Sequence, residues 1–297
     1  MHTHLARESD PSCGADANTD ASTRATLAPA PMRLHGIDFT SAPSRRKAIT
    51  VASGILSGNR FQLQSLSYLH DFDAFEHWLR RPGPWLGVFD LPFSLPRELV
   101  ETLDWPTRWP ALIAHLAAQT RPQLRATFKG FCDARAVGNK FAHRATDGSA
   151  GSSSSMKWVN PPVAYMLHAG VPRLINAGVT LFGMHAGDPV RIALEGYPGL
   201  VARSITRASY KNDEVRKQTV ERRAARATIL TALQAGEHRF GVRLDAGVHL
   251  PALLDDGRAD LLDAVLCGVL AAWAWQRRDA GFGLPAFDPL EGWIVGA

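Results

Sequence analysis

The sequence has few cysteines and lacks long apolar runs. Its 297 residues include three cysteines, Cys13, Cys132 and Cys267, which lie far apart and show no metal-ligand spacing. An odd number of separated cysteines predicts no disulfide framework and favours a reducing, cytoplasmic compartment. No apolar stretch approaches the ~20 residues that span a bilayer, and the N-terminus lacks the apolar centre of a secretory signal. We therefore expect no membrane association.

Sequence patterns of nucleotide and zinc sites are also lacking. No Gly-x-x-x-x-Gly-Lys-Ser/Thr pattern occurs, which argues against a P-loop nucleotide site. The eleven histidines form no His-Glu-x-x-His signature, so we interpret them as structural or surface residues. What the chain does have is the composition of a folded protein, 45% hydrophobic and 21% charged, with a net charge of +5. A basic balance favours a polyanionic partner such as nucleic acid.

The chain divides into an irregular start and a patterned remainder. Residues 1–31 are rich in Ala, Thr, Asp, Ser and Pro without periodicity, which predicts a disordered N-terminal tail. Residues 32–297 are expected to form a single domain. Within it, the Ser-rich segment at about 136–157 predicts a flexible insertion, either a solvated loop or a basic arm that orders on a substrate.

Hydrophobic periodicity predicts strands mixed with helices. Three strands over 33–40, 46–56 and 60–68 are joined by short turns, which favours antiparallel pairing. Further strands are expected over 85–90, 179–183, 190–195 and 241–244. Helices are expected over 73–80, 97–104, 107–119, 122–135, 161–177, 213–235 and 258–278, the first opened by a capping box from Asp73 to Glu76. The order predicts an α/β fold with a mixed sheet flanked by helices.

The strongest chemical signal lies in the last predicted helix. From Leu261 to Trp275 its only charged residue is Asp263, and a helix that is apolar all round is buried. A buried carboxylate without a partner is strongly destabilising, so Asp263 requires a base, a cation or a metal. Asp260 lies on the same helix face, and a divalent metal would offset the repulsion between the two acids. Asp260 can also be read as a charge that complements the helix N-terminus.

Three further acids each close an apolar strand: Asp38, Asp90 and Glu195. A single acid at a strand end is often a turn residue. Three of them together with the paired aspartates of the last helix predict a site of oxygen ligands. Such ligands suit Mg²⁺ or Mn²⁺ rather than zinc.

The order of these features resembles the RNase H-like nuclease superfamily, and the Asp260–Ala264 helix start is similar to that of RuvC-type junction resolvases. More narrowly, four short pieces resemble a family of predicted RNase H-fold nucleases, domain of unknown function number 429. These pieces are Gly36-Ile-Asp38, Phe89-Asp-Leu-Pro92, Glu195-Gly-Tyr-Pro198 and Leu262-Asp-Ala264.

The resemblance implies phosphodiester hydrolysis in DNA or RNA by a two-metal mechanism. Asp38 would bridge two Mg²⁺ or Mn²⁺ ions, Asp260 or Asp263 would complete the metal site, and Asp90 would be the fourth-strand acid. Glu195 would be a family-specific catalytic acid, and Glu76 on the first helix is a further candidate. The implied catalytic set is Asp38, Asp90, Glu195 and Asp263, and the implied metal ligands are Asp38, Asp90, Asp260 and Asp263.

A basic cluster near the predicted helix 213–235 supplies candidate substrate contacts. Its members are Lys211, Arg216, Arg222, Arg223 and Arg226. They are interpreted either as a solvated helix face or as a phosphate clamp.

Two alternatives to a nuclease stay open. One is a catalytically silent nucleic-acid-binding module with the same fold. The other is a phosphotransferase of the actin-like and sugar-kinase group, which needs glycines in the first turn to cradle phosphate. The turn here, Asp38-Phe-Thr-Ser-Ala-Pro43, has none, so this alternative is disfavoured.

Overall fold

The computed structural model describes residues 31–297, which form one compact unit. The tail predicted over residues 1–31 therefore lies outside the described residues, apart from Pro31. No helix of the described part is long and apolar enough to cross a membrane.

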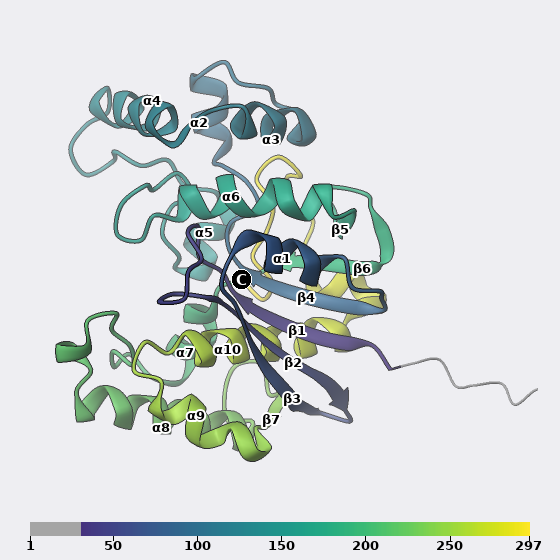
Figure 1. Cartoon of the computed structure of the whole chain (residues 1–297). Coiled ribbons are helices and arrows are strands. Elements are labelled where there is room, and N and C mark those ends of the chain that lie inside the picture. Colours follow the sequence, from purple (N-terminus) through teal and green to yellow (C-terminus); the bar gives the residue numbers. More distant parts are fainter. Residues whose placement is uncertain (1–30) are drawn as a thin grey trace, which may run out of the picture. The chain divides into compact units, whose positions relative to one another are not determined.

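A seven-stranded mixed sheet forms the centre of the unit (Figure 1). Its strand order is β5-β6-β4-β1-β2-β3-β7. The first three strands are antiparallel neighbours and the other pairs are parallel, which confirms the predicted α/β fold with a mixed sheet. The strands are β1 (Arg33–Asp38), β2 (Ile49–Ser57), β3 (Arg60–Leu69), β4 (Trp85–Asp90), β5 (Val179–Leu181), β6 (Asp188–Glu195) and β7 (Arg243–Asp245).

Helices cover both faces of the sheet and bury a separate apolar core on each (Figure 1). One face carries α1 (Phe72–Leu79) and α6 (Val163–Asn176), with α2 (Arg97–Thr102), α3 (Trp109–Ala117) and α4 (Arg121–Asp133) beyond them. The other face carries α7 (Pro198–Ile205), α8 (Val220–Ala235), α9 (Leu250–Asp255) and α10 (Asp260–Gln276). The remaining helical elements are α5 (Ala145–Ala150), η1 (Val215–Lys217), η2 (Gly247–His249) and η3 (Arg278–Gly283).

Helix α10 packs directly on β1 because Gly36 has no side chain. A Cβ atom at Gly36 would lie 2.0 Å from the Ala264 carbonyl oxygen and 2.1 Å from the Gly268 nitrogen, far closer than atoms can approach. Side chains two residues apart on a strand share a face, so Asp38 projects on the same side as Gly36. The glycine of Gly36-Ile-Asp38 thus brings the start of α10 towards Asp38.

Several predicted boundaries differ from the structure. Helix α1 is capped by Asp71, whose side chain accepts a hydrogen bond of 2.7 Å from the Ala74 nitrogen, so the predicted capping box at Asp73 is wrong. Helix α8 begins at Val220 rather than at residue 213, because the preceding segment is an irregular loop with one short 3₁₀ turn, η1. The last helix agrees with the prediction to within about two residues at either end.

The segment 136–157 also differs from the expected flexible insertion. It contains α5, and its Arg144, Asp147 and Met156 are buried. Arg144 pairs with Asp147 at 2.9 Å and with Glu195 of β6 at 2.6 Å. These interactions attach the second half of the segment to the sheet, so Arg144 is unavailable as part of a basic arm.

Candidate metal centre

Asp38 and Asp90 end two neighbouring parallel strands at the same level. They are register partners on β1 and β4, so their side chains leave the same face of the sheet. This is the face covered by α10, since Leu34, Leu86 and Val88 on the same side belong to the core around that helix. Both aspartates are half-buried at the carboxyl ends of their strands.

Helix α10 brings Asp260 and Asp263 to the same end of the sheet. Thr50, the register partner of Asp38 on β2, donates a hydrogen bond of 2.8 Å to the Asp260 carbonyl and so ties the start of α10 beside Asp38. The Asp263 side chain, one turn further on, is only 1% exposed. Asp38, Asp90, Asp260 and Asp263 thus come from two strands and one helix to the same end of the sheet.

The cluster is electrostatically strained. Burial raises the pKa of Asp38 well above its usual range, and the charges of Asp263, Asp90 and Asp260 raise it further. Burial likewise raises the pKa of Asp90 to about 7, although Lys211 partly opposes the shift. The pKa of Asp260 is raised by burial, with Lys47 acting in the opposite direction. Neither Asp38 nor Asp90 accepts a side-chain or backbone hydrogen bond from residues 31–297 that would offset these effects.

Asp263 has partners that the sequence did not reveal. Its Oδ1 accepts a hydrogen bond of 2.6 Å from the Tyr210 hydroxyl, and its Oδ2 forms an ion pair with the Lys211 ammonium group. Tyr210 and Lys211 lie in an irregular loop, 53 and 52 residues before Asp263, without any periodic pattern. Only the acid's need for a cation could have indicated that such a partner existed.

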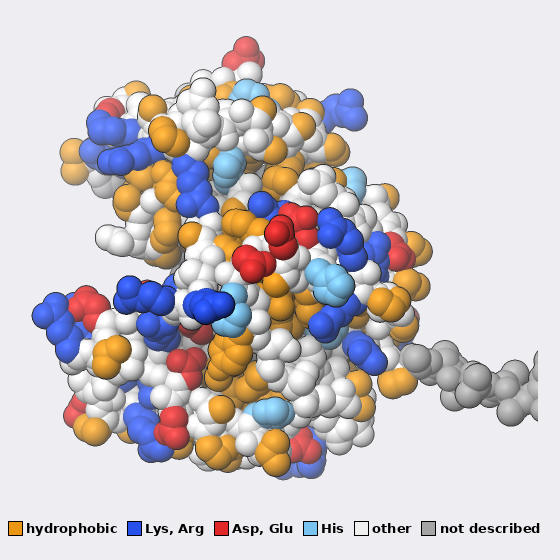
Figure 2. Space-filling model, viewed as in Figure 1, with side chains coloured by type: hydrophobic (Ala, Val, Ile, Leu, Met, Phe, Trp, Pro, Cys, Tyr) orange, Lys and Arg blue, Asp and Glu red, His pale blue; other side chains and the backbone are white. Residues whose placement is uncertain are grey.

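The aspartates open onto a cleft of about 670 Å³. Its acidic lining residues are Asp38, Asp90, Asp213 and Asp260, and its basic ones are Lys47, Lys211 and Arg258. Lys47 pairs with Asp213 at 3.1 Å. Figure 2 shows Lys and Arg side chains on both sides of the indentation at the left of the view, where the carboxyl ends of β1 and β4 lie. No sequence pattern indicated that Lys47 and Arg258 would line this cleft.

Glu195 projects from the opposite face of the sheet. It is the register partner of Phe89, whose side chain points away from that of Asp90. Its oxygens accept hydrogen bonds of 2.6 and 2.9 Å from Arg144 and of 2.9 Å from the Phe93 nitrogen. Burial raises the pKa of Glu195, and Arg144 opposes that shift. The structure therefore gives Glu195 a buried ion pair on the other face of the sheet. It still lines a hollow of about 350 Å³ together with Asp90 and Lys211, and its charge raises the pKa of Asp90.

Glu76 is also accounted for elsewhere. It pairs with Arg80 of its own helix at 3.1 Å and with Arg173 of α6 at 3.2 Å. It does not line the cleft of Asp38. The structure gives no support to a role for Glu76 in the metal site.

Most of the predicted phosphate clamp is engaged within the protein. Arg223 pairs with Asp255 at 2.8 Å and the exposed Arg216 with Glu214 at 2.9 Å. Arg226 is 3% exposed and donates to the Leu254 and Tyr210 carbonyls, both at 2.8 Å. Arg222 donates to the Lys211 carbonyl. Arg222 and Arg226 thus fix the loop that carries Tyr210 and Lys211, and the burial of Arg226 removes that residue from the predicted phosphate contacts.

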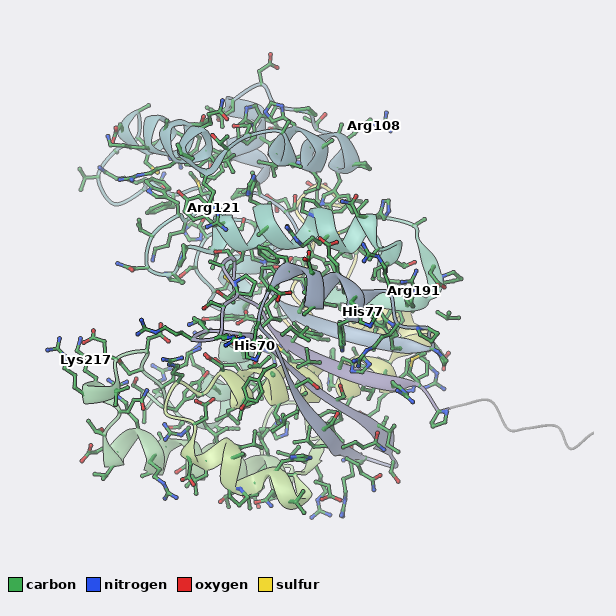
Figure 3. The ribbon with its side chains drawn as sticks, in the orientation of Figure 1. His70, His77, Arg108, Arg121, Arg191 and Lys217 are labelled. Carbon is green, nitrogen blue, oxygen red and sulfur yellow. The ribbon has the colours of Figure 1, made fainter. Side chains whose placement is uncertain are left out.

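A second basic surface lies on α4. Arg121, Arg125 and Lys129 line a hollow of about 460 Å³ with Tyr165. Arg121, labelled in Figure 3, donates a hydrogen bond to the Ser41 carbonyl in the loop after β1. This contact joins the α4 surface to the loop that lines the cleft.

The donor set suits a hard divalent cation, because it consists of carboxylates, three of which lie at the cleft. Within residues 31–297, no three His, Cys, Asp or Glu side chains are already arranged around an ion position. Asp263 is engaged by Tyr210 and Lys211 instead. No family model, curated protein or solved structure matches this chain.

Proposed function

We propose that this protein is a metal-dependent nuclease that hydrolyses phosphodiester bonds in DNA or RNA. The observation that carries the proposal is the convergence of Asp38 and Asp90 beside the start of α10, without hydrogen-bonded partners among residues 31–297, at the edge of an open cleft. Two adjacent half-buried carboxylates are unfavourable unless a cation binds them. Mg²⁺ or Mn²⁺ is the cation that oxygen ligands favour.

A divalent ion in this cleft would lower the pKa of a bound water molecule and offset charge on the leaving oxygen. The chain's own part is to hold Asp38, Asp90 and Asp260 towards the cleft on two strand ends and one helix start. Lys47 and Arg258 line the same cleft, and we expect them to bind phosphates flanking the reacting one, Lys47 by exchanging its exposed pairing with Asp213. The basic surface of α4 extends this positive lining, which supports a polyanionic substrate.

Cleavage assays test the proposal directly. The full chain is incubated with single-stranded, duplex and branched DNA and with RNA, in Mg²⁺, Mn²⁺ or EDTA. We expect metal-dependent cleavage that Asp38→Asn reduces by about a hundredfold or more. Asp279→Asn is the matched control, because that side chain is 90% exposed and is not among the residues that line the cleft.

The same assays separate the alternatives. Binding of an oligonucleotide without cleavage in either metal would contradict the nuclease proposal and favour a silent binding module. Hydrolysis of ATP without phosphodiester cleavage would instead favour a phosphotransferase. Equal cleavage by Asp38→Asn and the wild type would show that the aspartates are not the catalytic site.

A further inference from the structure

The Lys211 ammonium group lies against Asp263, where a metal ion bound by Asp263 would otherwise lie. The Lys211 side chain is 46% exposed, yet its ammonium group reaches the buried Asp263 carboxylate. Lys211 and Asp90 also line the same three adjoining hollows, so the lysine lies beside the strand-end acid as well. The Lys211 ammonium group therefore pairs with Asp263 and also acts on Asp90 at the cleft.

The loop around Lys211 is fixed from three directions. The Tyr210 hydroxyl occupies the other oxygen of Asp263 at 2.6 Å. The buried Arg226 holds the Tyr210 carbonyl at 2.8 Å, and Arg222 holds the carbonyl of Lys211 itself. Because two arginines of α8 hold consecutive backbone carbonyls, the backbone that carries the Lys211 side chain is fixed beside Asp263.

The charge of the site points the same way. With Asp263, the cleft contains five acidic and three basic side chains, so the fully ionised site carries two negative charges. One divalent ion neutralises these two negative charges. Two divalent ions would leave the site, without substrate, with a net positive charge. The acids without a hydrogen-bonded cation among residues 31–297 are Asp38, Asp90 and Asp260, since Lys47 pairs with Asp213.

We infer that Lys211 takes the place of one of the two metal ions, so that the site binds a single divalent cation with the Lys211 ammonium group as its second positive centre. The inference rests on the proposed metal-dependent function and specifies how that site is charged. Lys211 is thereby a cation of the centre and not an outward-facing phosphate contact. The carboxylates left to hold the ion are Asp38, Asp90 and Asp260.

Binding of Mn²⁺ alone to the full chain tests this. The number of ions bound and their affinity are measured at pH 7.5 by paramagnetic resonance of free Mn²⁺ and by calorimetry. We expect one Mn²⁺ per wild-type chain. Lys211→Met removes the competing charge, and we expect either a second Mn²⁺ or an affinity about tenfold tighter or more.

Three further variants separate the charge of Lys211 from its effect on folding. Lys211→Arg keeps the positive charge and is expected to bind one Mn²⁺ as the wild type does. Arg222→Met loosens the loop without removing a charge from Asp263, and should tighten Mn²⁺ binding by a smaller factor even where Lys211→Met folds poorly. Lys217→Met is the matched control, because Lys217 lies on η1 at the outer edge of the helices in Figure 3 and pairs with Glu214.

The two ways in which the inference can fail are distinguishable. Two Mn²⁺ ions in the wild type, or identical binding by the wild type, Lys211→Met and Arg222→Met, would overturn the role of Lys211 and leave the metal-dependent proposal standing. Absence of Mn²⁺ binding in the wild type and in every Lys211 and Arg222 variant would overturn both.

Discussion

Asp90 lies beside Asp38 as its register partner across two parallel strands, and burial raises the pKa of Asp90 to about 7. Between about pH 4 and 7 the folded protein holds a proton on Asp90 that the unfolded chain has lost. The free energy of unfolding therefore decreases as the pH rises through this range. The two carboxylates therefore destabilise the metal-free protein at neutral pH. Carboxylates that destabilise the metal-free protein are expected of a metal site, and this destabilisation can be measured without any substrate.

Replacing Asp90 by asparagine should stabilise the metal-free protein. We expect Asp90→Asn to raise the free energy of unfolding at pH 8 by about 2 kcal/mol, a figure reduced for the solvent at the cleft. The gain should shrink as the pH falls towards 4, where the wild-type acid is protonated. Urea denaturation in EDTA measures both, with Asp279→Asn as the control. A loss of stability at pH 8 would show that burying the ionised Asp90 does not destabilise the metal-free protein.

Gly36 is predicted to tolerate no side chain. A methyl group there would meet backbone atoms of α10 at 2.0 and 2.1 Å, so Gly36→Ala must push the helix away from β1. We expect a loss of about 3 kcal/mol or more in the free energy of unfolding. Gly130→Ala on α4 is the matched control, since a Cβ there meets nothing within 4 Å and alanine favours a helix. Equal thermal melting of both variants would contradict the close approach.

Arg144 is predicted to be structural. Its removal would leave Glu195 and Asp147 buried without a counter-charge, and breaking a buried pair in this way costs about 3–5 kcal/mol. We expect Arg144→Met to lose stability of that order and Glu195→Gln to restore part of it in the double variant. Chemical denaturation of the single and double variants provides the measurement. Wild-type stability of Arg144→Met would mean that the ion pair contributes nothing.

His35 gives a pH signature separate from the acids. Burial lowers the pKa of His35 to about 3, assisted by the charges of Arg33 and Arg81. Because the unfolded chain binds a proton below about pH 6.5 that the folded chain does not, this residue lowers stability as the pH falls towards 3. The slope is about 1.4 kcal/mol per pH unit.

Substitution of His35 should remove that slope. We expect His35→Gln to be less stable than the wild type at pH 7.5, because it loses the edge contact with Trp78. The difference should narrow by about 2 kcal/mol between pH 6.5 and 5. Urea denaturation at several pH values measures the change, and a constant difference would show that His35 titrates normally.

Local sequence pattern was sufficient for the first three strands and for the burial of the last helix. The alternation and short turns of residues 33–69 predicted three antiparallel strands, and the uninterrupted apolar character of 261–275 predicted a buried helix with one trapped acid. The register between strands and the packing of side chains could not be predicted from local sequence. Asp90 and Glu195 both close apolar strands, yet the pairing of Glu195 with Phe89 turns it to the opposite face.

Local sequence alone establishes that Asp263 needs a cation and that Asp38 and Asp90 end buried strands, since burial and strand periodicity depend on neighbouring residues. Which cation pairs with each acid is visible only in the folded protein. Lys211 reaches Asp263 and Arg144 reaches Glu195 across 52 and 51 residues. Such contacts depend on how loops are anchored after the sheet has formed, and no local pattern encodes them.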